Sequence, residues 1–340
     1  MPVHRTLFGS YRGEDVLCFS LERGGLVAEI LGWGATLRSL RVAGTDVDLV
    51  VGLERFEEYP AQQAYLGATV GRFANRIEGG RFTLDGRSYR LPRNERGRHT
   101  LHGGPDNLAR RVWAAETDPE GCAVRFSIFS PDGDQGFPGN LHARCTYRLT
   151  EEAILRIEME AETDAPTPVN FAHHSYWNLA GTGTIDGHLL EIEADHYLEA
   201  GPDTIPTGRI LEVAGTRYDF RALRRIDAAG DADYDNCFLV RGEGFRRVAR
   251  LEDPVSGRRM ELWADPPGVQ LYTGFKLDIT TSTGRRIGPR AGLCLETENF
   301  PNAPNIPRFP NAILRSGETY RHRMEHRFTL PGEPGSPGNR

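Results

Sequence analysis

The chain has 340 residues, 39% apolar and 26% charged, which is an ordinary balance for a globular protein with a large core. Its net charge of −6 at pH 7 argues against nucleic acid or an anionic membrane surface as a partner, because both require clusters of basic side chains. No apolar run approaches the ~20 residues that span a bilayer, and the N-terminal segment lacks the pattern of a secretory signal. We therefore expect a cytoplasmic protein that does not bind membranes.

Along the chain, the sequence indicates short strands separated by turns. The segment "RFTLDGRSYRL" (81–91) predicts a hairpin that turns at Asp85-Gly86, since type I′ turns require residues that tolerate positive φ. Apolar and charged residues alternate in "AILRIEMEAE" (153–162) and again in "LLEIEAD" (189–195), which predicts strands with one buried and one solvated face. No stretch of 12 or more residues has a convincing helical period. The fold class is therefore all-β with few short helices.

Turn residues also bear on the domain organisation. The 39 glycines and 22 prolines are spread along the chain rather than collected in a linker. We expect one large antiparallel β-sandwich domain over residues 1–330, because many short strands at close spacing favour a sandwich. The Pro/Gly-rich segment 331–340 has too little apolar surface to pack and is expected to be disordered. The odd number of cysteines without a CxxC pair predicts free, buried thiols at Cys18, Cys122, Cys145, Cys237 and Cys294.

Polar side chains gather in seven segments where a sandwich does not need them. Considered singly, each has a simpler explanation in turn chemistry, packing or a solvated strand end. The segments are "GRFANRI" (71–77), "LHGG" (101–104), "SPDGDQGFPGNL" (130–141), "HHSYWNLAG" (173–181), "YDNCF" (234–238), "GVQLYTG" (268–274) and "CLETENFPNAPN" (294–305).

In this order and rough spacing, the seven segments resemble those of the aldose 1-epimerases, the galactose mutarotases. The resemblance runs from about residue 32 to about residue 330. It implies a large antiparallel supersandwich of the galactose-mutarotase type, with a sugar cleft on one sheet. It also implies an isomerase that interconverts the α and β anomers of free aldohexoses such as galactose and glucose, with a monosaccharide substrate and no cofactor.

The resemblance assigns roles to individual residues of this chain. It implies that His174 is the general acid, Glu296 the general base and His102 a second active-site histidine. It implies contacts with the substrate at Asn75, Arg76, Asp235 and Gln270.

The adjacent histidines His173 and His174 raise the question of a metal. In an extended segment their side chains point to opposite faces, so they cannot share an ion, and no third ligand stands at a recognisable zinc spacing. We therefore expect no metal, with His174 facing the cleft and His173 in a structural or supporting role. The family more commonly has Asn at the position of His173 and Gln at that of Glu298. Glu298 either raises the pKa of Glu296 or turns outward.

Several alternatives stay open on the sequence. Tyr272, Phe300 and Trp177 either stack on a pyranose ring or belong to the core. A non-catalytic sugar-binding module and a glycoside hydrolase using Asp235 and Glu296 compete with the epimerase hypothesis. A hexose-phosphate mutarotase would require a basic pocket. For the oligomeric state we expect a monomer or a weak dimer.

Overall fold

The computed structural model describes residues 3–229 and 232–330, and the predicted disordered tail, 331–340, lies outside these ranges. Within them, strands and turns dominate, and the only α-helix is the single turn α1 (Glu58–Ala61). None of the helices in these ranges has the length and apolarity that a membrane crossing requires. Short 3-10 turns occur at Glu78–Gly80, Leu108–Arg110, Asp134–Gly136, Ile226–Ala229 and Ala303–Asn305.

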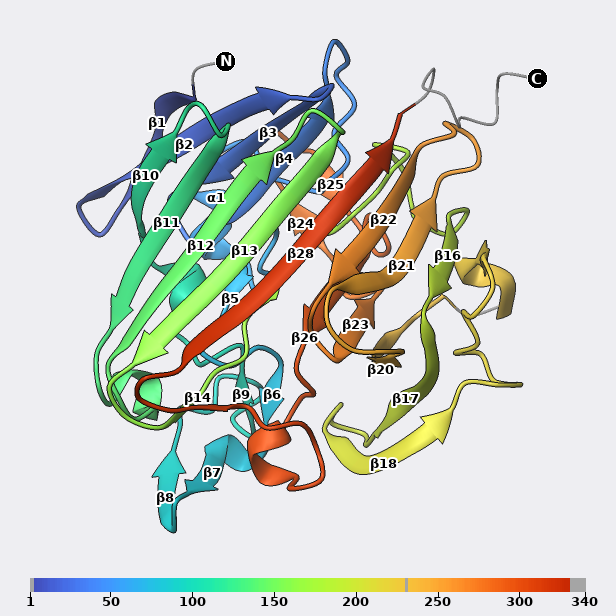
Figure 1. Ribbon diagram of the computed structural model, residues 1–340. Helices are drawn as coiled ribbons and strands as arrows, with labels where there is room; N and C mark the ends of the chain where they lie inside the picture. Colours follow the sequence, from blue (N-terminus) through green and yellow to red (C-terminus); the bar gives the residue numbers. More distant parts are fainter. Residues whose placement is uncertain (1–2, 230–231, 331–340) are drawn as a thin grey trace.

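A nine-stranded antiparallel sheet forms one layer of the molecule (Figure 1). Its central strands carry the alternation seen in the sequence: in β13, Leu155, Ile157 and Met159 are buried between half-buried charged residues. In order across the sheet, the strands are β10 (Ala114–Asp118), β11 (Ala123–Ser130), β12 (Leu141–Leu149), β13 (Ile154–Thr163), β28 (Thr319–Thr329), β22 (Arg259–Ala264), β21 (Arg246–Glu252), β16 (Leu189–Ile192) and β19 (Arg224–Arg225).

Two smaller antiparallel sheets pack against the large one through the shared core and form the second layer. The main apolar core fills the space between the layers, with contributions from Phe19 and Ile30 on one small sheet, Leu271 and Leu295 on the other, and Met324 on the large sheet. The four-stranded sheet consists of β1 (His4–Tyr11), β2 (Glu14–Arg23), β3 (Leu26–Leu31) and β4 (Thr36–Val42). The five-stranded sheet has the order β18 (Pro206–Glu212), β17 (Ala194–Ala200), β20 (Asp235–Val240), β23 (Gly268–Tyr272) and β26 (Cys294–Glu298).

Five two-stranded ladders complete the described fold, and residues of two of them, such as Arg76 and Ile279, line the cleft described below. The predicted hairpin is confirmed, and its turn residues Asp85 and Gly86 both have positive φ, 49° and 77°. The ladders pair β5 (Thr69–Val70) with β15 (Ala172–His173), β6 (Arg76–Ile77) with β9 (Thr100–Leu101), β7 (Arg81–Leu84) with β8 (Arg87–Arg90), β14 (Thr167–Pro168) with β27 (Ile313–Leu314), and β24 (Ile279–Thr280) with β25 (Arg286–Ile287).

The segment 189–195 keeps its predicted alternation but is divided between two sheets. Leu190 and Ile192 face the core from β16, and Ala194 does so from β17. The chain crosses from one layer to the other at Glu193, so one sequence pattern serves both layers.

The five cysteines are free and buried, as predicted.

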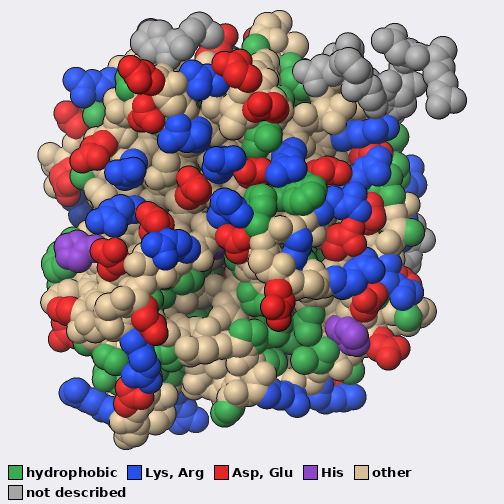
Figure 2. Space-filling model, viewed as in Figure 1, with side chains coloured by type: hydrophobic (Ala, Val, Ile, Leu, Met, Phe, Trp, Pro, Cys, Tyr) green, Lys and Arg blue, Asp and Glu red, His purple; other side chains and the backbone are tan. Residues whose placement is uncertain are grey.

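The outer face of the large sheet is solvated. Figure 2 shows basic and acidic side chains intermixed over it, and pairs such as Arg156–Glu325 and Arg247–Glu261 join neighbouring strands. Neither sign of charge dominates this face, which agrees with the argument from composition against a polyanionic partner.

Candidate active site

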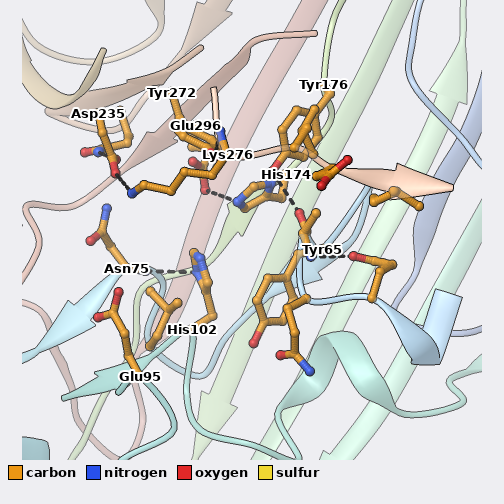
Figure 3. Close-up of a pocket in the computed structure, with 18 of the residues that line it drawn as sticks. Tyr65, Asn75, Glu95, His102, His174, Tyr176, Asp235, Tyr272, Lys276 and Glu296 are labelled. Atoms are coloured by element: carbon orange, nitrogen blue, oxygen red, sulfur yellow. Dashed lines mark hydrogen bonds and ion pairs between the residues drawn. The ribbon is translucent and has the colours of Figure 1, made fainter. Parts of the chain in front are cut away.

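A cleft of about 630 Å³ opens on the side of the five-stranded sheet that faces away from the core. Figure 3 shows its polar side chains converging from several elements. All seven site residues expected from the sequence line this cleft: Asn75, Arg76, His102, His174, Asp235, Gln270 and Glu296.

Strand alternation places three of these residues on one face. Gln270 of β23 is directly opposite Glu296 of β26 in the antiparallel register. Their neighbours Leu271 and Leu295 point into the core between the layers. Asp235, at the start of β20, is opposite Tyr272, which also lines the cleft. The sheet therefore supplies a carboxylate pair and an amide from adjacent strands.

His174 follows β15 and is held through its backbone. Its N–H donates to the Ala68 carbonyl and its carbonyl accepts from the Gly67 N–H, both at 2.9 Å. Its ring lies in the cleft, 5.2 Å between centroids from the ring of Tyr176. Burial lowers the pKa of His174 to about 4, so its imidazole is neutral at pH 7.

His173 points away from the cleft, as the period of an extended chain predicts. Its Nε2 is 2.7 Å from the Ser175 hydroxyl and its Nδ1 is 3.3 Å from the Tyr147 hydroxyl. Its ring contacts that of His326 on the large sheet. The expectation that the two adjacent histidines cannot share one ion is confirmed by this geometry.

His102 and Asn75 hold each other in place. The His102 N–H donates to the Asn75 carbonyl at 2.9 Å, and the Asn75 N–H donates to His102 Nδ1 at 3.2 Å. Both residues have positive φ, 52° and 60°, a conformation that costs energy for a side chain such as histidine. Because Nδ1 accepts a hydrogen bond, the neutral imidazole carries its proton on Nε2. Burial also keeps the pKa of His102 well below its usual range.

The catalytic candidates His174 and Glu296 are neighbours. His174 Nε2 lies 3.6 Å from Glu296 Oε2, and that oxygen is buried without a hydrogen-bond partner among the described residues. Burial raises the pKa of Glu296 well above its usual range, and the nearby carboxyls of Glu298 and Asp235 raise it further. Both shifts disfavour the charged forms, so the buried pair favours a protonated Glu296 carboxyl beside a neutral His174 imidazole.

Glu298 turns inward, which decides between the two alternatives left open for it. It is fully buried, and its carboxyl oxygens accept hydrogen bonds from Asn75 Nδ2 at 3.1 Å and Asn170 Nδ2 at 3.5 Å. Burial raises the pKa of Glu298 to about 8. Glu298 therefore lies behind the candidate base on the same strand and contributes to its electrostatics.

The remaining polar groups of the cleft form two clusters. Arg76 donates to both carboxylate oxygens of Glu95 at 2.8 Å. Gln270 Nε2 donates to Asp235 Oδ1 at 2.8 Å, and Lys276 Nζ donates to Asp235 Oδ2 at 3.4 Å. The cleft thus presents donors and acceptors together, which is what a ligand rich in hydroxyl groups requires.

Among the described residues, one cluster has the ligand types and spacing of a metal site. It consists of His102, His174 and Glu296, whose donor atoms lie within 4.8 Å of one another. A metal on His102 Nε2 would force the ring proton to Nδ1, where it would face the Asn75 N–H. His102 is therefore arranged to donate a hydrogen bond rather than to bind an ion.

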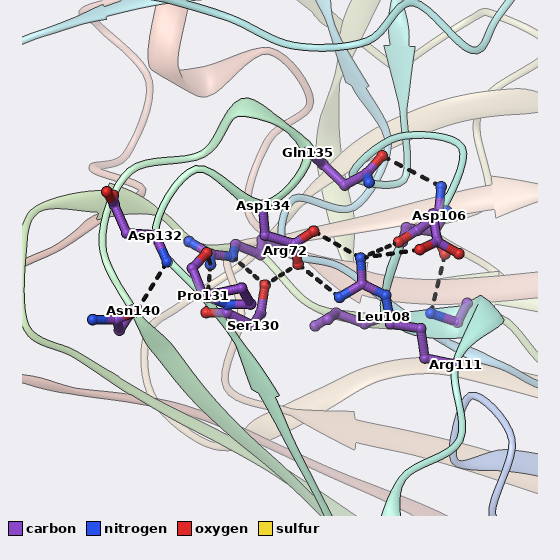
Figure 4. Close-up of polar contacts among 12 residues, drawn as sticks. Arg72, Asp106, Leu108, Arg111, Ser130, Pro131, Asp132, Asp134, Gln135 and Asn140 are labelled. Carbon is purple, nitrogen blue, oxygen red and sulfur yellow. Dashed lines mark hydrogen bonds and ion pairs between the residues drawn. The ribbon is translucent and has the colours of Figure 1, made fainter. Parts of the chain in front are cut away.

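Arg72 stands near the site residues in the sequence, but it serves a different part of the structure. Its guanidinium donates five hydrogen bonds to the loop 130–139: to the Ser130 hydroxyl and to the carbonyls of Ser130, Pro131, Pro138 and Gly139 (Figure 4). With Arg72 so occupied and Arg76 paired with Glu95, neither of these two arginines is free to bind a sugar phosphate.

The aromatic candidates are divided between cleft and core. Tyr272 lines the cleft, whereas Trp177 is buried against His326 and Phe300 packs against Phe309. The sequence interpretation missed Tyr65, Tyr176, Glu95 and Lys276, which also line the cleft. The tyrosines carry no sequence signal that separates them from core residues, but Lys276 does, because it is the only lysine of the chain.

A β-sandwich with a histidine–carboxylate pair in a cleft of mixed hydrogen-bonding groups defines the class of the galactose-mutarotase-like proteins. The fold agrees with that of an aldose epimerase homologue from C. elegans, with a TM-score of 0.87 and 31% identity over 92% of this chain and 98% of that one.

The chain belongs to the aldose 1-epimerase family, because the sequence model of that family matches residues 17–327. It is 39% identical to a galactose mutarotase of Rattus norvegicus over 97% of this chain and 99% of the relative. It is 37% identical to an aldose 1-epimerase of Escherichia coli strain K12, over 89% and 92%. Its activity is that of an aldose 1-epimerase, a carbohydrate isomerase.

Proposed function

We propose that this enzyme interconverts the α and β anomers of free aldohexoses such as galactose and glucose, with His174 as general acid and Glu296 as general base. The observation that carries the proposal is the buried, unpartnered Oε2 of Glu296, 3.6 Å from His174 Nε2. A buried carboxyl oxygen without a partner is costly, and a substrate hydroxyl would satisfy it.

The reaction breaks and re-forms the bond between C1 and the ring oxygen, and besides this it only moves protons. A base takes the proton of the C1 hydroxyl while an acid gives one to the ring oxygen, and the ring opens to an aldehyde. After rotation about the C1–C2 bond, the two groups exchange roles and the ring closes from the other face. Glu296 and His174 suit this cycle because together they hold one proton. The neutral pair and the carboxylate–imidazolium pair have the same net charge, so one proton transfer converts the resting form into the reactive one.

The other cleft residues orient the sugar. His102 presents its Nε2–H, a donor for the ring oxygen or an adjacent oxygen as charge develops there. Arg76, Asp235 and Gln270 supply donors and acceptors for the remaining hydroxyls. Asn75 is largely committed to Glu298 and to Arg76, whose backbone N–H donates to Asn75 Oδ1 at 2.9 Å. It contributes by holding these neighbours and has one amide hydrogen left for the substrate.

The glycoside hydrolase alternative is less well supported. It needs two carboxyls that flank the glycosidic bond as its acid–base pair, whereas the titratable partner 3.6 Å from Glu296 is the imidazole of His174. The sugar-binding module does not account for the unpartnered Glu296 oxygen beside His174.

Polarimetry of freshly dissolved α-galactose or α-glucose tests the proposal. Catalytic amounts of enzyme should accelerate the approach to the equilibrium rotation, and excess EDTA should leave the rate unchanged. A nitrophenyl galactoside should release no phenol. Phenol release, or an approach no faster than the spontaneous one, would contradict the proposed function.

A further inference from the structure

Lys276 lines the cleft but is not part of the acid–base pair. The chain has 41 cationic Lys and Arg side chains, and Lys276 is the single lysine among them. Its side chain lines the cleft beside the candidate catalytic residues (Figure 3). Arginine serves every other cationic position, so the chemistry that distinguishes lysine from arginine is used at this site alone.

Lys276 is held at both ends. Its backbone N–H donates to the Tyr272 hydroxyl at 3.2 Å. Its ammonium lies 4.9 Å from the centre of the Phe275 ring and 3.4 Å from Asp235 Oδ2. Half of the side chain remains exposed to the cleft. Nζ is therefore directed toward the carboxylate without being enclosed.

The contact with Asp235 is incomplete as an ion pair. Charge-assisted hydrogen bonds between nitrogen and a carboxylate are usually about 2.7–2.9 Å long, and this one measures 3.4 Å. Asp235 Oδ1 is already occupied by Gln270 at 2.8 Å, so Oδ2 is the oxygen left for a ligand. A sugar hydroxyl can accept from an ammonium and donate to a carboxylate at the same time.

Lysine fits this position better than arginine would. An ammonium has three donors on one atom, so Lys276 can contact Asp235 and keep two N–H groups for a substrate. A guanidinium tends to take both oxygens of a carboxylate in a fork, as Arg76 does with Glu95. Such a fork at Asp235 would compete with Gln270 and close the carboxylate to the sugar.

We propose that Lys276 is a substrate-binding residue: its ammonium and the Asp235 carboxylate together bind one sugar hydroxyl, which bridges Nζ and Oδ2. This inference rests on the proposed function and adds a contact to it. The charge of Lys276 is balanced by Asp235 and that of Arg76 by Glu95, so these two pairs favour a neutral sugar hydroxyl over a phosphate.

Kinetics of K276M and K276R provide the first test. With galactose or glucose, K276M should raise KM about tenfold while kcat changes less than about threefold. The variant loses a hydrogen bond from a charged donor to a sugar hydroxyl, and that bond is present in the bound substrate as well as in the transition state. K276R should not restore KM. R144M, which removes a half-exposed arginine on the outer sheet, is the matched control and should behave as wild type.

Deoxy sugars distinguish direct binding of a sugar hydroxyl by Lys276 from an indirect effect of Lys276 on the position of Asp235. Among the 2-, 3-, 4- and 6-deoxy derivatives, one should show the same KM with K276M and wild type, because it lacks the bridging hydroxyl. Equal losses of affinity for all four would overturn the inference, as would an unchanged KM for the parent sugar. Inactive wild-type enzyme would instead contradict the proposed function, so the two failures are distinguishable.

Chemical labelling gives an independent readout. Apart from the α-amino group, Lys276 Nζ is the only amine of the chain, so intact-mass measurements after reductive methylation report on it directly. Saturating sugar should slow its modification at least fivefold, and K276R should lose that site of labelling. Modification of Lys276 at the same rate with and without sugar would overturn the inference.

Discussion

Among the single residues, Glu298 is expected to set the electrostatics of the cleft. Burial raises its own pKa to about 8, so above that pH Glu298 is ionised and its negative charge raises the pKa of the neighbouring base. E298Q keeps an amide oxygen that accepts from Asn75 but removes the second carboxyl. We expect the pKa of Glu296 to fall, so the alkaline limb of kcat/KM, where the His174–Glu296 pair loses its proton, should move to lower pH.

Polarimetric pH profiles of wild type and E298Q between pH 5 and 10, corrected for spontaneous mutarotation, measure this shift. An alkaline limb at the same pH in both enzymes would show that Glu298 does not act on the base.

His173 provides a prediction about stability rather than catalysis. Burial holds its pKa well below that of an unfolded histidine, so below pH ~6.5 the unfolded state binds one proton more than the folded state. Stability is therefore lost as pH falls. H173N removes this group, and the slope of the unfolding free energy against pH between about 6.5 and 4.5 should decrease, by at most ~1.4 kcal/mol per pH unit.

Urea unfolding of H173N and wild type at several pH values in this window gives the two slopes. Any change in stability that is constant with pH, such as the loss of the contact with Ser175, cancels from the comparison. Parallel slopes would mean that His173 is protonated equally in both states.

For the secondary-structure elements, alternation along strands was the most informative sequence signal. It correctly predicted the buried face of β13 and the opposite directions of His173 and His174, whereas the hairpin at Asp85-Gly86 was predicted from its turn residues. Alternation depends only on backbone geometry, so a single chain suffices to see it. It did not indicate that Ile192 and Ala194 belong to strands of different sheets, because both side chains are buried in the same core between the layers.

The loop 130–139 illustrates a long-range contact that no local pattern reveals. Arg72 is 58 residues from Ser130, yet its guanidinium satisfies four carbonyls of this loop. R72M should destabilise the protein by about 3 kcal/mol or more, because buried carbonyls lose their donors. R315M, at an exposed arginine paired with Asp85, is the control and should leave the unfolding midpoint unchanged.

Chemical denaturation and limited proteolysis test this prediction together. The loop should become the first site of cleavage in R72M. Wild-type stability combined with an intact loop would contradict the role assigned to Arg72.

For the whole molecule, the resemblance of seven ordered segments predicted the fold class and the family, and both are confirmed. The sequence did not predict how the cleft residues pair with one another. Those pairings, such as that of Asn75 with Glu298 across 223 residues, depend on how the sheets and ladders pack in three dimensions. The stacking candidates Trp177 and Phe300 show the same limit, since an aromatic residue has no local signal that separates core from cleft.

The prediction that residues 1–330 form one domain has a direct test. One continuous core joins strands of the nine-, five- and four-stranded sheets, so unfolding should occur in a single transition. Circular dichroism and tryptophan fluorescence should give coincident urea curves, whereas two separated transitions would indicate two domains. Sedimentation of the native protein without urea tests the expectation of a monomer or a weak dimer.

The central claim is that His174 and Glu296 form the acid–base pair, and single-site kinetics test it most directly. By polarimetry with galactose, E296Q and H174N should each lose about 10²–10⁴-fold in kcat with sugar binding largely retained, because each removes one partner of the proton exchange. The double variant should be little worse than the poorer single one, since the two groups act as a unit. H173N should keep most of the activity. Near wild-type turnover in E296Q or H174N, or loss of turnover in a folded H173N enzyme, would contradict the account.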